Sequence, residues 1–140
     1  MKRRDFLKLQ AKGAVLLSGL AAGLPVPALA AGPDLGVATG GPGPATRAAV
    51  ELLGGMAQFV KPGNKVVIKP NMSFAQPPEM ATNTHPEVVQ AIAAMCWEAD
   101  AGEVLVLDNP LRSSEKCLER SDIAEACLLI KDDMVHGLQD

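Results

Sequence analysis

The sequence predicts an α/β fold, a partial open parallel sheet with a βαβ unit, preceded by a signal peptide. Two short apolar runs, Val66–Ile68 and Val104–Asp108, have the β-branched composition of buried strands. Between them, apolar residues recur at three- and four-residue steps, as on one face of a helix. The first 30 residues carry a basic start, an apolar run and small residues, which is the order of an export signal.

The amino-terminal segment predicts export. After the basic stretch MKRRDFLKLQ, the apolar run Ala14–Leu24 has 11 residues, whereas a membrane-spanning helix needs about 20. Ala28 and Ala30 form the A-x-A pattern of a signal-peptidase site, which predicts cleavage before Ala31. Residues 1–30 are therefore expected to be removed, leaving no stable membrane span.

The pair Arg3-Arg4, followed by DFLK, is similar to the twin-arginine signal by which bacteria export folded proteins. We therefore expect the twin-arginine export machinery as a partner, and a periplasmic or otherwise exported location. An ordinary secretory peptide and a retained membrane anchor are the alternatives.

Charge argues against nucleic acid as a partner. The first 30 residues hold five of the 13 basic and one of the 16 acidic residues, so residues 31–140 keep 8 basic and 15 acidic residues, a net charge of −7. Binding to phosphates requires clustered Lys and Arg, and no basic run remains. An anionic membrane surface is disfavoured for the same reason.

Three cysteines, Cys96, Cys117 and Cys127, show no C-x-x-C spacing, so zinc-ribbon and ferredoxin motifs are absent from the sequence. An oxidising compartment would permit one disulfide, with one thiol left over. The alternative is that most of them are small buried hydrophobic residues. The pattern does not decide their disulfide state.

Three regions follow from composition. Residues 1–30 are the signal peptide, 31–44 form a Gly/Pro-rich linker, and 45–140 form part of an α/β domain. Helical spacing runs over 45–60, although Gly54-Gly55 weakens that helix or ends it early. Pro62 and Gly63 then indicate a turn.

The βαβ unit begins at the first apolar run, where Pro70 ends the strand because it has no N–H to donate. Thr84 and Glu87 have the spacing of a capping box, so the second helix is expected to start after Thr84 and to end near Gly102. Helical segments are predicted at 114–120 and 122–130, and a short third strand within MVHGLQ.

Polar residues gather where both strands end. Ligands of open parallel sheets bind beyond the carboxyl ends of the strands. Helix amino termini, with free N–H groups, suit anions. We therefore predict one cleft, with the Lys69 ammonium and the Asp108 carboxylate within about 10 Å of each other, roughly a Debye length. The predicted ligand-binding residues are Lys69, Asn71, Thr84, His85 and Asp108.

Each candidate also has a purely structural interpretation. Thr84 can act as a plain helix cap, His85 as an exposed first-turn residue, and Asn71 and Asp108 as turn formers. Lys69 closes a buried strand and therefore needs a partner or access to water. The loop 72–83 exceeds the usual two to six residues of such a connection, as binding loops commonly do.

Residues 45–127 resemble the bacterial and archaeal family catalogued as Domain of Unknown Function 362, in particular its members with twin-arginine signals. The similarity rests on Lys69-Pro70-Asn71, on the segment Thr84–Val89 and on the strand ending at Asp108. Asp100 and Asp122 stand where that family tends to have Gly. Family members are longer, so the resemblance implies that the chain is an amino-terminal part of such a protein.

The leading hypothesis is an exported protein that binds a small anionic or metal-bound ligand at the carboxyl edge of the sheet. Some family members carry ferredoxin-type iron–sulfur domains, so the resemblance also implies a second hypothesis, a non-catalytic partner of a periplasmic redox assembly. A non-functional fragment is the third. The sequence identifies no substrate, reaction or cofactor.

Overall fold

The structure, a computed structural model, describes residues 32–138, so the predicted signal peptide and its cleavage site lie outside it. Short 3₁₀ turns at Met56–Gln58 and Pro78–Met80, labelled η2 and η3, interrupt two of the connections. The remaining elements are α2 (Pro42–Leu52), β1 (Lys65–Ile68), α3 (Pro86–Glu98), β2 (Glu103–Asp108), α4 (Ser114–Arg120), α5 (Ile123–Leu128) and β3 (Val135–Gly137).

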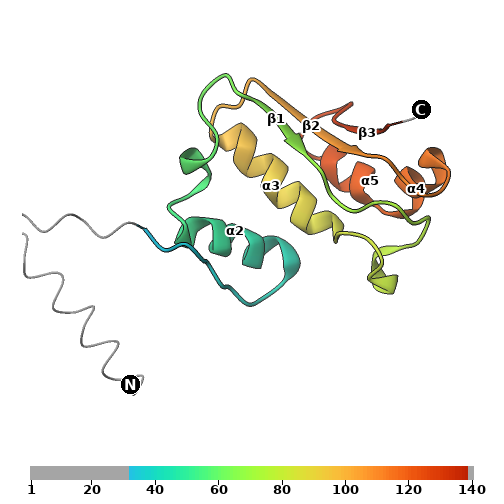
Figure 1. The fold of residues 1–140 in the computed structure, drawn as a ribbon, viewed down its shortest axis with the longest axis horizontal. Helices are drawn as coiled ribbons and strands as arrows, with labels where there is room; N and C mark the ends of the chain where they lie inside the picture. Colours follow the sequence, from blue (N-terminus) through green and yellow to red (C-terminus); the bar gives the residue numbers. More distant parts are fainter. Residues whose placement is uncertain (1–31, 139–140) are drawn as a thin grey trace, which may run out of the picture. The chain divides into compact units, whose positions relative to one another are not determined.

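The three described strands form one open parallel sheet in the order β1-β2-β3, as Figure 1 shows. Val66 lies opposite Val104, and Val106 lies between Ile68 and Val135. The segment β1-α3-β2 is the predicted βαβ unit, because its two strands pair in parallel. The third strand predicted near the carboxyl end is also present, as are the two short helices before it.

Helices cover one face of the sheet. α3 packs on β1 and β2, and α5 packs on α3 and β3, while α2 lies against α3. Exposure alternates along the strands: Val104, Val106 and Asp108 are buried, and Val67 on the opposite face is 60% exposed. The prediction that Val66–Ile68 is buried on both faces is therefore wrong, because no described segment packs on the other face and β1 is an outer strand.

α3 starts differently from the prediction. Its N-cap is His85, whose ring Nδ1 accepts a hydrogen bond from the Glu87 N–H at 3.3 Å, and Pro86 occupies the first turn. The capping box expected from Thr84 does not form. The Glu87 carboxylate instead accepts a hydrogen bond from the Gly43 N–H at 3.3 Å, so it ties the start of α3 to α2.

The other ends of these helices follow local backbone chemistry. α3 ends at Glu98, slightly before the expected Gly102, and Asp100 then adopts a left-handed φ of 61°. α2 begins at Pro42, inside the predicted linker, because proline is tolerated in a first helical turn. It ends at Leu52, before Gly54 and Gly55 with φ of 96° and 82°, so the prediction of an early end is confirmed.

The core lies between the sheet and α3 and α5. Val89, Ala93 and Cys96 of α3 pack with Val104 and Val106 of β2, and the cluster includes two residues of α5, Ile123 and Cys127. Full burial of a side chain such as Ile123 contributes about 1.5–3 kcal/mol to stability. All three cysteines are buried and unbridged, as the hydrophobic interpretation predicted. Trp97 packs against this core.

Candidate functional site

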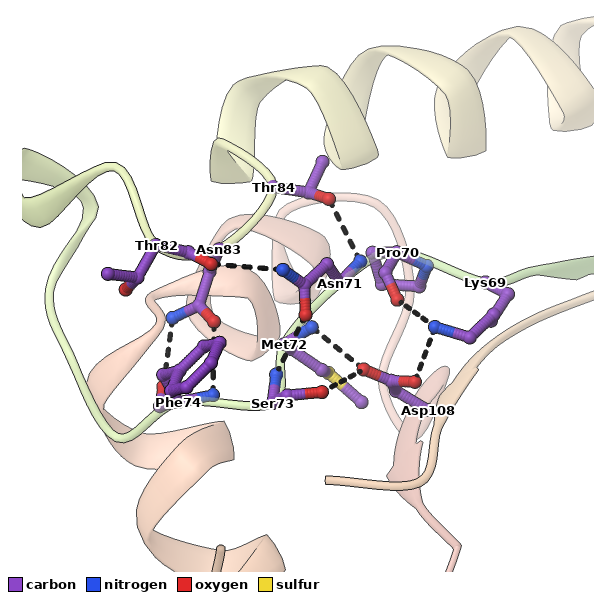
Figure 2. Close-up of polar contacts among 10 residues, drawn as sticks. All are labelled: Lys69, Pro70, Asn71, Met72, Ser73, Phe74, Thr82, Asn83, Thr84 and Asp108. Atoms are coloured by element: carbon purple, nitrogen blue, oxygen red, sulfur yellow. Dashed lines mark hydrogen bonds and ion pairs between the residues drawn. The ribbon is translucent and has the colours of Figure 1, made fainter. Parts of the chain in front are cut away.

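The two charged residues predicted at the strand ends are in direct contact. The Lys69 Nζ lies 2.6 Å from the Asp108 Oδ1, well inside the predicted separation, as Figure 2 shows. Their adjacency follows from the parallel register, because Ile68 lies opposite Val106, β1 ends at that pair and β2 ends two residues beyond it. Burial differs across the pair: the Lys69 side chain is 68% exposed and the Asp108 side chain is 3% exposed.

The Asp108 carboxylate joins three segments of the chain. Its Oδ1 binds Lys69, and its Oδ2 accepts hydrogen bonds from the Met72 N–H at 2.8 Å and from the Ser73 hydroxyl at 3.5 Å. Burial raises the pKa of Asp108, but the hydrogen bonds from Lys69 and from the N–H groups of Met72 and Asn109 outweigh it, so the pKa lies below its usual value. The carboxylate is therefore ionised at neutral pH, with both oxygens occupied by donors of the protein.

Lys69 is the partner of that pair that faces outward. Its ammonium donates to the Asp108 carboxylate and to the Pro70 carbonyl at 3.0 Å. An ammonium group has three N–H donors, so one remains for solvent or for a ligand. Asp108 thus holds an exposed cationic group in a defined position at the edge of the sheet.

Asn71 and Thr84 close the neck of the loop that follows β1. The Thr84 N–H donates to the Asn71 carbonyl at 2.8 Å, and the Asn71 N–H donates to the Thr84 hydroxyl at 2.9 Å. The Asn71 side-chain amide also donates to the Thr82 carbonyl at 2.9 Å. Thr84 is therefore a loop-closing residue, which corrects the prediction that it caps the helix.

Asn83 ties the two sides of the same loop together. Its Oδ1 accepts a hydrogen bond from the Phe74 N–H at 3.1 Å, and its Nδ2 donates to the carbonyls of Phe74 at 2.9 Å and Gln76 at 3.2 Å. The side-chain amide thus pairs with the backbone as a neighbouring strand would. The loop 72–83 is consequently tethered at its neck and along its sides, as Figure 2 shows, and it is not slack.

His85 occupies a separate position in this group. Its Nδ1 accepts the bond from the Glu87 N–H, so in the neutral ring the proton lies on Nε2. Nε2 donates to no other group among residues 32–138, and none of the hydrogen bonds described there joins His85 to Lys69 or Asp108. His85 lies near the other predicted site residues only because it follows Thr84 in the sequence.

Ser73 and Asn83 belong to this cluster, although neither is among the five predicted ligand-binding residues. Both carry a detectable signal, since Asn and Ser side chains readily bond to nearby backbone groups in loops. What the sequence did not reveal is which backbone groups they reach. That choice depends on how the loop folds back on β1.

Among residues 32–138, no three side chains of His, Cys, Asp or Glu converge as they would to hold a metal ion. The helices of that same part are all too short or too polar to cross a membrane.

Comparison with known proteins places the chain in context. The model of the family described as "Domain of unknown function (DUF362)" matches residues 66–139, which include both strand ends of the cluster. A thylakoid-associated protein of Synechocystis sp. is 41% identical over 70 residues, or 50% of this chain. The match spans only 22% of that relative's length. No solved structure matches the chain significantly.

Proposed function

The chain belongs to the DUF362 family, and we propose that it is an exported α/β protein that binds a small anionic or metal-bound ligand at the carboxyl edge of its sheet. One observation carries the proposal: a buried carboxylate, Asp108, holds the Lys69 ammonium in place while leaving it largely exposed. Edges of this kind are where open parallel sheets bind ligands.

The residues of the cluster take different parts in this proposal. Lys69 contacts the ligand, because it is the exposed donor with an uncommitted N–H. Asp108 is a positioning residue, since its oxygens are already bonded to Lys69, Met72 and Ser73. Asn71 and Thr84 hold the neck of the loop, and the His85 Nε2–H supplies a second donor next to that neck. We assign no reaction to the site.

Identification of the bound molecule tests this proposal. The full chain is purified from the exported fraction without added ligand, denatured, and analysed by mass spectrometry for released small molecules and metals. We expect one anionic compound, alone or with its metal, in an amount comparable to the protein. Release of nothing beyond what an unrelated exported protein carries would contradict the proposal.

Export by the twin-arginine route is the second part of the proposal. The pair Arg3-Arg4 motivates it, and the thylakoid association of the Synechocystis relative supports a location outside the cytosol. Replacing both arginines by lysine keeps the charge and should leave the precursor in the cytoplasm, as judged by fractionation and immunoblotting. Unchanged export of this double variant would refute the twin-arginine route.

A second candidate function, a non-catalytic subunit of a periplasmic redox assembly, is favoured by exposed apolar side chains on β1 and on the segment before it. Phe59 and Val67 are each 60% exposed, and Leu52 is also exposed. Apolar surface of this kind commonly marks a contact with another protein. Under this alternative, the purified chain carries no small molecule, and substitutions at Lys69 have no effect on its assembly.

A further inference from the structure

Within residues 32–138, β1 has one unpaired edge. One side of this strand pairs with β2, and β1 is the outermost strand of the sheet. Within residues 32–138, none of the hydrogen bonds joins its other side to a loop, helix or side chain. An outer edge presents a row of N–H and C=O groups that an additional extended strand can satisfy along its whole length.

The surface beside this edge is apolar. A depression of about 520 Å³ runs along β1 and is lined by the strand itself and Asn64, together with Met56, Phe59, Val60, Ile92 and Cys96. It opens on the core side of the strand, where Val66 and Ile68 point. The depression provides room for apolar side chains of an added strand.

We propose that β1 pairs antiparallel with β1 of a second copy of this chain, joining two three-stranded sheets into one. A twofold axis brings the same edge of both copies together, which is the commonest way in which soluble proteins form closed oligomers. Both copies then satisfy the unpaired backbone groups of the other, and each covers the apolar depression beside the partner strand.

The alternation of side chains restricts the register. A twofold axis perpendicular to the sheet keeps the helix-covered face of both copies on the same side, so only residues that point to the same face can lie opposite each other. Placing Val67 opposite its own copy sets Val66 opposite Ile68, so each of these cross-strand pairs is apolar. The two neighbouring allowed registers would set Val67 against Lys65 or against Lys69, and we therefore favour the first.

Charge is also compatible with this register. It brings Lys65 near Lys69 of the second copy, and like charges directly opposite each other destabilise a sheet. Each lysine, however, already has a carboxylate partner in its own chain: Glu103 lies 2.9 Å from Lys65, and Asp108 lies 2.6 Å from Lys69. Each lysine at the junction of the two strands is therefore part of a neutral ion pair.

Analytical ultracentrifugation of the full chain over a concentration series tests the proposal. We expect a monomer–dimer equilibrium, and we expect Val67→Glu to abolish the dimer because it places two carboxylates opposite each other at the axis. Leu129→Glu is the matched control, because it makes the same kind of change at a side chain that is 82% exposed after α5. This control should dimerise as the wild type does.

A monomer at every concentration would overturn the proposal and leave the edge to a strand of another polypeptide. A dimer that survives Val67→Glu in a folded variant would also overturn it. If that variant does not fold, oxidative cross-linking decides: Val67→Cys should give a covalent dimer, because side chains directly opposite each other lie within disulfide reach. Leu129→Cys should give none, and equal cross-linking of the two variants would refute the pairing.

Discussion

Two lysine–carboxylate pairs join β1 to β2, one at each end of the sheet. At the amino end, Lys65 and Glu103 lie 2.9 Å apart with side chains 83% and 42% exposed. At the carboxyl end, Lys69 and Asp108 lie 2.6 Å apart, and Asp108 is 3% exposed. The residue types and the strands are alike, so the difference lies in what surrounds each carboxylate.

The Lys65–Glu103 pair is a surface contact, whereas the Lys69–Asp108 pair also holds the neighbouring loop in place. Within residues 32–138, the Glu103 carboxylate has one polar partner, the Lys65 ammonium. Asp108 adds bonds to the Met72 N–H and the Ser73 hydroxyl, so it holds the beginning of the loop 72–83 as well as the ammonium. Water screens the first pair, whereas loss of the second would leave buried donors without acceptors.

Replacing each carboxylate in turn should give the largest difference in stability between the two ends of the sheet. Asp108→Ala should lower the free energy of unfolding by about 2–3 kcal/mol, because the buried Met72 N–H loses its acceptor. Glu103→Ala should lower it by less than about 1 kcal/mol, as for exposed ion pairs. Urea denaturation of the two variants measures both values. Equal losses would show that the carboxyl-end pair has no special role in stability.

The amino and carboxyl ends of the sheet also differ in how an asparagine side chain holds the adjacent loop. Asn83 makes three bonds across the loop 72–83, so Asn83→Ala should cost about 1–2 kcal/mol and open that loop to proteases. Asn64 at the amino end accepts one side-chain bond, from the Lys61 N–H, so Asn64→Ala is the matched control with a smaller cost. Limited proteolysis with mass spectrometry of the fragments locates the cut. Cleavage outside 72–83 in the Asn83 variant would contradict this role.

At the amino end of the sheet, stability can be raised by relieving backbone strain rather than by changing a charge. Asp100 has a left-handed φ of 61°, which glycine adopts without strain, so Asp100→Gly should stabilise the protein by about 1 kcal/mol. Thermal unfolding measures the change. Gly102→Ala is the contrasting variant, because an added Cβ would lie 2.9 Å from the Gly63 carbonyl oxygen, so it should destabilise. A lower midpoint for Asp100→Gly would show that the Asp100 side chain makes a needed contact.

A fall in pH should change the stability less than the substitutions above do, and it should have no effect near neutral pH. The pKa of Asp108 is lowered in the folded state, so its contribution to stability is complete above the usual pKa of an aspartate. That contribution is lost as the pH falls through the lowered value. Asp108→Asn should therefore flatten the fall in stability below about pH 4. Identical slopes of stability against pH for wild type and variant would contradict the lowered pKa.

Much of the fold could be predicted because local patterns reveal it. The apolar runs at β1 and β2, the helix period between them and the short third strand were all read correctly from periodicity and breakers. Burial of β1 on both faces was not, because an apolar run does not reveal which faces are covered by other segments. Val67 belongs to such a run and yet is exposed.

The candidate site shows the same division. Topology was sufficient to bring Lys69 and Asp108 together, because parallel strands end at the same edge. Thr84 was misassigned because its spacing to Glu87 fits a capping box, while its hydroxyl is bonded to the Asn71 N–H. Asn83 is not among the predicted binding residues because its partners, Phe74 and Gln76, are brought to it only by the folded loop.

Ligand occupancy of matched lysine variants tests the central claim most directly. Lys69→Met and Lys65→Met each remove one ammonium from one end of β1. Lys69→Met leaves the buried Asp108 carboxylate bonded to the Met72 N–H, and urea denaturation checks that both variants are folded. The quantity to measure is the amount of small molecule released per mole of denatured protein, by mass spectrometry. We predict loss of the ligand from Lys69→Met and wild-type occupancy in Lys65→Met. Equal occupancy of the two variants would contradict a ligand site at the carboxyl edge of the sheet.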